Sequence, residues 1–357
     1  MSKRIGFWAL VLFLAIYPTV VLTTAFARTP DGTMSPATQV NASSAGFAPL
    51  LDVNHIPPNQ QPQDLVDALH AAFGRHHARA VHTKGVMLVG SFTPAREAKT
   101  ICKAPIFAGG TLPVVARYSV FAGVPTLPDN AGPASPSGLA LKIKAEDGND
   151  YDVVANNHNG FIVATTDEFA LFLRAVGASG PGATHPTPVE QFLSTRPIAR
   201  KFTQSLTYPA SYATATFFGV NSFKVTNAQG TPLYVRTRIV PRAGEHYLKP
   251  DELKAKGENY LEDEIVARVA KAPVVYDWYA QVAESGDKIE DPSIAWPESR
   301  KLVKLGTFSI TRLPDDANLT DRTTLFLPGQ PHPGVEPADP MLVLRNKAYP
   351  ISFQGRQ

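Results

Sequence analysis

The sequence predicts an α+β fold in which an antiparallel β-sheet or closed β-barrel carries attached helices. Short apolar or alternating runs are separated by clusters of Gly, Pro and Asn, as is typical of strands joined by tight turns. Segments whose apolar residues recur at helical spacing are grouped between these runs and do not alternate with them. Consecutive strands with helices grouped elsewhere favour an antiparallel architecture.

The individual elements follow from local patterns. A helix is expected over residues 63–79, where apolar residues recur at helical spacing after Pro62. A hairpin is expected around residues 227–230, because Asn and Gly favour a tight turn between strands 222–226 and 233–240. The remaining expected strands are 86–92, 114–120, 139–145, 151–154 and 306–313, and the remaining expected helices are 167–176, 189–202 and 259–271.

Composition limits the class of protein. The chain has 357 residues, 44% of them hydrophobic and 18% charged, so it can bury a substantial core and is not disordered as a whole. Its 34 basic and 31 acidic residues are interleaved and give a net charge of +3, so nucleic acid is not a favoured partner. The single cysteine, Cys102, excludes an internal disulfide framework and a metal site built from several thiolates.

The N-terminus has the features of a targeting segment. Lys3 and Arg4 precede an apolar run, residues 6–27, which ends in the small-x-small sequence Ala-Phe-Ala. We expect residues 1–27 to be a signal peptide, or a membrane anchor if the segment is not cleaved, and we expect export to the periplasm. Residues 28–50 are rich in Ser, Thr, Pro and Gly and are expected to form a flexible spacer before one domain, 51–357.

Several common chemistries find no support in the sequence. The chain has no GxGxxG after an expected strand, no GxxxxGK[ST], no HExxH, no GxSxG and no CxxC. Several polar residues lie within apolar segments. Each of these residues, taken singly, can be explained as a hydrogen-bonded structural group. RAVHTKG contains Arg79 and His82, VVARYSVF contains Arg117 and Ser119, DYDVVANN contains Asn156, and LRNKAYPISF contains Arg345 and Tyr349.

Taken together, these segments resemble the haem catalases. RAVHTKG resembles their distal-histidine segment, ARYS the Arg-x-Ser segment that follows, DVVANN the distal-asparagine segment and RNKAYP the proximal-tyrosine segment, in the family's order. The stretches KIKAEDGNDYDVVANN, SFKVTNAQGTPLYV and PGVEPADPMLVLR also resemble catalase segments, so the resemblance covers about residues 52–356. The chain ends eight residues after Tyr349 and is much shorter than a full-size catalase. It is therefore most similar to the small catalase-related peroxidases, and a single haem-binding barrel of catalase type is expected.

The resemblance implies a b-type haem with ferric iron, for which Tyr349 would be the proximal ligand. Tyrosine binds ferric iron as phenolate, and the cation of Arg345, four residues earlier, would stabilise that form. Pro350 implies that any helix here is ending. Asp339 matches an acidic residue that supports this arginine, whereas Asn221 stands where the family has a histidine, so Arg345 is expected to lack an imidazole partner.

On the distal side, the resemblance makes His82 the proton shuttle for cleavage of the peroxide O–O bond. Asn156 would hold the bound peroxide, and Ser119 would orient the His82 imidazole through a hydrogen bond. The arginines matching those that bind the two haem carboxylates are Arg79, Arg117 and Arg356. The residues matching the apolar wall of the pocket, each also compatible with a simple core position, are Val81, Phe161 and Phe169.

The function implied is a haem-dependent peroxidase that reduces hydrogen peroxide and oxidises a small organic electron donor in response to oxidative stress. Dismutation of peroxide to water and oxygen is the close alternative, since both activities share the first step. A haem carrier without turnover and an enzyme acting on a lipid hydroperoxide also stay open. We expect a monomer or simple dimer, because full-size catalases assemble through N-terminal arms that this chain largely lacks.

Overall fold

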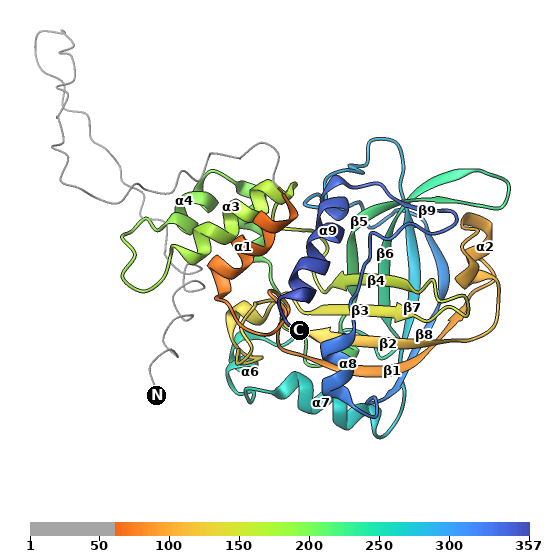
Figure 1. The fold of residues 1–357 in the computed structure, drawn as a ribbon, viewed down its shortest axis with the longest axis horizontal. Coiled ribbons are helices and arrows are strands. Elements are labelled where there is room, and N and C mark those ends of the chain that lie inside the picture. Colours follow the sequence, from red (N-terminus) through yellow and green to blue (C-terminus); the bar gives the residue numbers. More distant parts are fainter. Residues whose placement is uncertain (1–60) are drawn as a thin grey trace, which may run out of the picture.

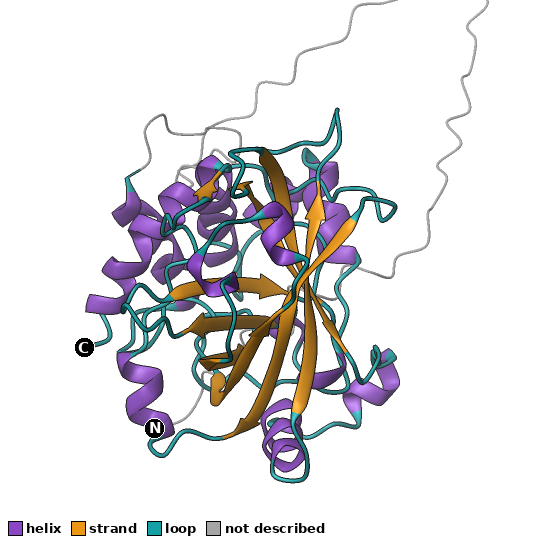
Figure 2. Cartoon of the chain, turned by 90° about the vertical axis from the view of Figure 1, so that its right-hand side faces the viewer, coloured by secondary structure: helices purple, strands orange, loops and turns teal. Residues whose placement is uncertain are grey.

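Eight antiparallel strands, β1 to β8, form a closed barrel at the centre of the fold (Figures 1 and 2). A computed structural model describes residues 61–357; the predicted signal segment, the spacer and residues 51–60 lie outside the described residues. The strands are β1 (Gly85–Pro94), β2 (Leu112–Ser119), β3 (Gly138–Ile143), β4 (Tyr151–Asn156), β5 (Phe217–Thr226), β6 (Pro232–Pro241), β7 (Val274–Val282), β8 (Leu302–Arg312) and the short β9 (Val335–Pro337).

The strand order explains how the barrel closes. Neighbours run β4-β3-β2-β1-β8-β7-β6-β5, and β4 pairs with β5 through Asn156 opposite Phe218. The strand β9 adds to the free edge of β5, with Phe223 opposite Pro337. All these pairings are antiparallel, so the predicted α+β class and the antiparallel barrel are confirmed.

The strand β7 is absent from the sequence-based expectations. Its residues Val274, Tyr276, Trp278 and Ala280 are all buried and alternate with more exposed neighbours, which is the period-2 pattern of a strand. The pattern is therefore present in the sequence and could have been recognised. The expected strand 151–154 is also longer than expected, because β4 continues to Asn156.

The barrel interior is packed with aromatic rings. Phe92, Trp278 and Phe308 lie with ring centroids 5.0 to 5.6 Å apart, and each ring is almost completely buried. Gly306 makes this packing possible, since a Cβ at that position would lie 2.3 Å from the Phe92 ring. The barrel is thus a filled core at this level and not an open channel.

A layer of helices covers one end of the barrel and has its own apolar core. Figure 1 shows α9 between the barrel and the helices α1, α3 and α4, and the buried residues of these helices form one cluster. The helices are α1 (Pro62–Phe73), α2 (Ala98–Ile101), α3 (Thr166–Gly177), α4 (Pro188–Ser194), α5 (Pro197–Gln204), α6 (Pro250–Lys254), α7 (Tyr260–Val269), α8 (Ala317–Thr323) and α9 (Pro340–Gln354).

Three helix expectations need correction. Helix α1 ends at Phe73 and not at residue 79, because Gly74 has φ of +88° and leaves the helical path. The expected helix 189–202 is two helices, since Pro197 begins α5 after the break at Thr195. Finally, α9 does not end at Pro350; it continues to Gln354, with the proline inside the helix.

Candidate active site

His82 lies in the irregular segment between α1 and β1 with its backbone in the left-handed region, at φ of +53°. Three contacts stabilise this conformation. The His82 N–H donates to the Phe121 carbonyl at 2.8 Å, and the His82 carbonyl accepts from Arg117 Nη1 at 2.7 Å. Ser119 Oγ lies 3.1 Å from His82 Nδ1, as the sequence-based hypothesis expects, and fixes the rotation of the ring.

The surroundings of His82 favour the neutral imidazole. Burial, followed by the positive charges of Arg117 and Arg345, lowers the pKa of His82 to about 3. The ring is therefore uncharged near neutral pH, with one nitrogen engaged by Ser119 and the other able to accept a proton. Neutral imidazole is the form that a proton acceptor needs.

Asn156 lies at the end of β4, where the barrel closes. Its Oδ1 accepts a hydrogen bond from the His158 N–H at 2.8 Å. The Nδ2 group has no hydrogen-bond partner in residues 61–357, and Asn156 and His82 line the same cavity. The side chain can thus donate a hydrogen bond to a ligand in that cavity.

Tyr349 and Arg345 lie one turn apart on α9 and are in contact. Arg345 Nη2 donates to Tyr349 Oη at 2.5 Å, and its guanidinium lies 5.6 Å from the centre of the tyrosine ring. The guanidinium thus directs a charge-assisted N–H donor at the tyrosine oxygen.

Asn221, on β5, extends this pair into a chain of four groups. Its Oδ1 accepts from Arg345 Nη1 at 2.7 Å, and its Nδ2 donates at 2.6 Å to Asp339, the N-cap residue of α9. Burial raises the pKa of Asp339, and the hydrogen bond from Asn221 opposes that rise. The Asn221 amide, which stands where the resemblance has a histidine, thus bridges Asp339 and Arg345 directly.

Two adjoining cavities lie between these groups. The larger, of about 550 Å³, is lined by His82, Asn156, Phe161 and Arg345 among other residues. The smaller, of about 130 Å³, is lined by His82, Tyr349 and the three predicted carboxylate-binding arginines. Both cavities are mainly apolar and share His82, Val154 and Ala155 as lining residues.

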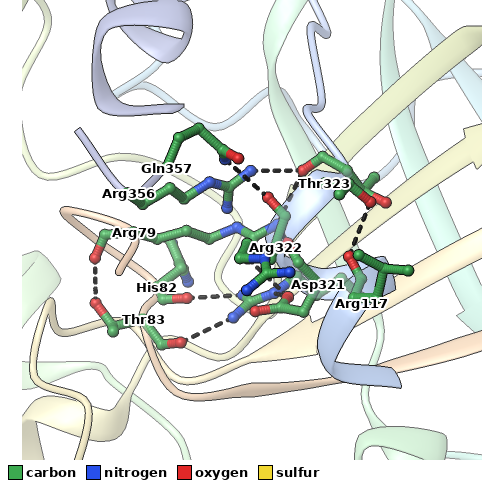
Figure 3. Close-up of polar contacts among 11 residues, drawn as sticks. Arg79, His82, Thr83, Arg117, Asp321, Arg322, Thr323, Arg356 and Gln357 are labelled. Atoms are coloured by element: carbon green, nitrogen blue, oxygen red, sulfur yellow. Dashed lines mark hydrogen bonds and ion pairs between the residues drawn. The ribbon is translucent and has the colours of Figure 1, made fainter. Parts of the chain in front are cut away.

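The three arginines meet at one side of the smaller cavity (Figure 3). Asp321, on α8, accepts from Arg79 Nη1 and from Arg117 Nε, each at 2.6 Å. Arg356 donates to the Thr324 carbonyl, but its Nε and Nη1 are buried with no hydrogen-bond partner among residues 61–357. Burial, together with the charge of Arg117, lowers the pKa of both Arg79 and Arg356, as expected where like charges gather. The cluster has the electrostatics of an anion-binding site.

The residues predicted for the apolar wall divide into two groups. Val81 and Phe161 line the cavities. Phe169 does not line either cavity; it is buried behind Phe161, with the two ring centroids 4.9 Å apart. Its contribution is to hold Phe161 in place.

Two residues of the site were missed by sequence reasoning. No sequence pattern distinguishes Asp321, because it is one of several acidic residues in a polar stretch. Gly138, on β3, faces the distal pair: a Cβ there would lie 2.8 Å from both His82 Nδ1 and Ser119 Oγ. The absence of a side chain at Gly138 gives the imidazole and the serine hydroxyl room to meet.

Two features, a metal-binding cluster of side chains and a membrane-spanning helix, are absent from the described residues. Within residues 61–357, no cluster of three or more His, Cys, Asp or Glu side chains is suited to binding a metal ion directly. No helix in this part of the chain is both long and apolar enough to cross a membrane.

The fold and the site together define a β-barrel protein with an internal ligand pocket between a neutral histidine and a tyrosine–arginine pair. A family model described as catalase matches residues 62–356, and the chain belongs to the catalase family. Full-size relatives share the fold at low identity. A fungal catalase has a TM-score of 0.68 at 22% identity over 87% of this chain and 66% of its own, and catalase A from Saccharomyces cerevisiae has a TM-score of 0.67 at 20% identity, with 87% and 68% covered.

Two curated relatives are similar in size as well as in sequence. The catalase-related peroxidase of Synechococcus elongatus is 32% identical over 301 residues, which cover 83% of this chain and 88% of the relative. The catalase-related peroxidase of Mycolicibacterium paratuberculosis is 33% identical over 301 residues, with 83% and 94% covered. The predicted membership of a small catalase-type group is thus confirmed.

Proposed function

We propose that the protein is a haem-dependent peroxidase that reduces hydrogen peroxide and oxidises a small organic electron donor. One observation carries the proposal: His82 and Tyr349, which come from opposite ends of the described chain, line the same cavity. A proton acceptor and a potential iron ligand on one cavity form the arrangement that peroxide cleavage at haem iron requires.

The residues around the cavity fit a haem. The three guanidinium groups and the single carboxylate of Asp321 leave an excess of two positive charges, which two haem propionates would neutralise. Arg356 Nε and Nη1, which have no partner among the described residues, are donors available to such a ligand. Tyr349 would hold the iron as phenolate with Arg345 beside it, and Val81 and Phe161 would pack on the porphyrin.

Bound haem would supply the redox-active iron that takes oxidising equivalents from peroxide and passes them to a donor. The chain's own residues would manage the proton. His82 would accept the peroxide proton on the imidazole nitrogen not engaged by Ser119, then return it to the departing oxygen. Asn156 would donate its free Nδ2 hydrogen to the peroxide and hold it beside His82.

The names and lengths of two similar proteins favour peroxidase activity over dismutation. The two similar proteins named catalase-related peroxidase align over 88% and 94% of their lengths, whereas the chain spans about two thirds of the full-size catalase structures.

The test compares oxygen release with oxidation of a chromogenic donor, in wild type and in H82A. We expect donor oxidation to exceed oxygen release in the wild type. The variant is expected to keep its haem spectrum and lose peroxide cleavage by about 10²–10⁴-fold. The matched control is H77A, at an exposed histidine outside both cavities. Vigorous oxygen release without donor oxidation would assign catalase activity. A haem-loaded wild type that cleaves peroxide no faster than free haem would support the haem-carrier alternative, and unchanged cleavage in H82A would contradict the role of His82.

We further propose that the protein is exported, with residues 1–27 acting as signal or anchor. The basic start and the apolar run in the sequence support this proposal. Fractionation of expressing cells with determination of the mature N-terminus tests it, and full-length protein in the cytoplasm would contradict it.

A further inference from the structure

The carboxylate of Asp321 and the backbone of His82 are joined by one buried guanidinium, that of Arg117 (Figure 3). We propose that Asp321 is a positioning residue for His82 and acts through Arg117. The inference rests on the proposed function in that it assigns His82 the proton-transfer role. It goes beyond that function by assigning to α8, none of whose residues is buried, a role in placing His82.

Arg117 is placed to hold the left-handed backbone of His82. Its Nη1 donates to the His82 carbonyl at 2.7 Å, and its Nη2 donates to the Thr83 carbonyl at 2.8 Å. A non-glycine residue at positive φ persists only where the surroundings constrain it. Two adjacent carbonyls bound by one planar guanidinium provide such a constraint, because the fork fixes their relative orientation.

Asp321 fixes the guanidinium itself. Arg117 is only 3% exposed, and its remaining contact is the one from Nε to Asp321 Oδ1 at 2.6 Å. Backbone carbonyls offer no counter-charge, so the carboxylate is the group that makes a buried cation acceptable here. It binds the edge of the guanidinium away from the two carbonyls and thus sets the rotation that points both Nη groups at them.

A second set of contacts closes the arrangement into a ring. Asp321 Oδ1 also accepts from Arg79 Nη1, and the Arg79 Nη2 group donates to the Asp321 and Thr324 carbonyls. Thr83 Oγ1 in turn donates to the Arg79 carbonyl at 2.5 Å. Asp321 therefore holds the segment that carries His82 directly at Arg79 and, through Arg117, at Thr83.

The charge on Asp321 is maintained within this ring. Burial opposes its ionisation, but Arg117 and Arg79 outweigh burial and lower the pKa of Asp321. A neutral amide at this position would keep the shape and lose the charge. The substitution D321N therefore tests whether the charge of Asp321 is needed to hold Arg117 and Arg79 in place.

The experiment uses the haem-loaded enzyme and its D321N variant. We expect D321N to retain haem and an unchanged ferric absorption spectrum while the rate constant for peroxide cleavage falls by about 10- to 100-fold. The rate of cyanide binding to the iron should fall in parallel, because hydrogen cyanide must also give its proton to a base in the pocket. The control is D315N, which removes an exposed carboxylate whose one ion pair within residues 61–357 is with Arg312.

Further variants test the route through Arg117. D321E keeps the charge but moves the carboxylate, and both rates are expected to fall between those of wild type and D321N. In an R117K background, D321N should cause no further loss, because the two residues act as one unit. Independent losses in the double variant would contradict action through Arg117.

A readout that does not depend on peroxide separates this inference from the proposed function. Amide hydrogen exchange in a peptide spanning residues 79–84 should be at least about tenfold faster in D321N, with exchange in β1 unchanged. Unchanged exchange and unchanged cyanide binding would overturn the inference. Loss of haem with a normal rate per haem would instead assign Asp321 to ligand binding alone. A wild-type protein that cleaves no peroxide would contradict the proposed function, while the exchange result would still decide the positioning role.

Discussion

The distal pair of His82 and Ser119 occupies a space that Gly138 leaves open. His82 Nδ1 and Ser119 Oγ lie 3.1 Å apart beside Gly138. A Cβ at Gly138 would lie 2.8 Å from both atoms. Contacts this short force a neighbour to move. Because the ring rotation of His82 is set by Ser119, the displacement would act on the group that accepts the proton.

We therefore predict that G138A lowers the rate constant for peroxide cleavage by about 10- to 100-fold, since small displacements of a reacting group have effects of this size. The rate is measured by rapid mixing of the haem-loaded variant with hydrogen peroxide. The matched control is G257A, because a Cβ at Gly257 would meet no atom within 4 Å. A G138A variant with the wild-type rate would show that the His82–Ser119 geometry has no part in cleavage.

Among the elements, the strands were predictable where one face is apolar over several residues. The expected strands overlap β1 to β6 and β8 because alternation and turn residues are local properties of the sequence. The ends of helices were less predictable. Gly74 and Pro197 divide segments with continuous apolar spacing, whereas Pro350 does not end α9. In α9, burial of Met341, Leu342 and Ala348 holds the helix in place despite the proline.

The helix α8 offers a test of how an exposed element supports the site. It buries none of its residues, and the contacts that hold it include its N-cap, the ion pairs of Asp321 and a hydrogen bond from Gln357 to the Arg322 carbonyl. Asp316 caps the helix: its Oδ1 accepts from the Leu319 N–H at 2.8 Å, and its carbonyl accepts from Thr320. Loss of such a cap costs about 1 kcal/mol.

We predict that D316A speeds amide exchange in α8 by about fivefold, which corresponds to about 1 kcal/mol of local stability. Exchange is measured by mass spectrometry on peptides covering α8 and, for comparison, β8. The control is N318A, at an exposed residue of the same helix for which no side-chain hydrogen bond is formed within the described part of the chain. Equal exchange in both variants would indicate that the Asp316 cap has no part in maintaining α8.

At the scale of the whole molecule, the site lies where the barrel and the helical layer meet. The smaller cavity is lined by β2 and β3 on one side and by α9 on the other. The motif residues were predictable because each segment carries its own local pattern. Asp321 was not, because its contacts with Arg79 and Arg117 span 242 and 204 residues. The bridge through Asn221 was not predictable either, because it requires β5 and the start of α9 to lie side by side.

The burial of His82 also links the site to the stability of the molecule. Its pKa is lowered from 6.5 to about 3 in the fold, so the unfolded chain takes up a proton at a higher pH than the folded protein does. The stabilising contribution of the neutral imidazole is complete above pH 6.5 and is lost as the pH falls towards 3. Over this window, the free energy of unfolding should fall by up to about 1.4 kcal/mol per pH unit because of this one group.

We predict that the difference appears when wild type and H82Q, both freed of haem, are unfolded by urea at a series of pH values. Other groups that titrate with altered pKa, such as His158 and Asp339, are common to both proteins and cancel in the comparison. The wild-type curve should therefore descend more steeply than the H82Q curve below pH 6.5, and the two should run parallel above it. Parallel curves over the whole range would mean that His82 takes up a proton as readily in the fold as in the unfolded chain, and that burial and the charges of Arg117 and Arg345 do not keep it neutral.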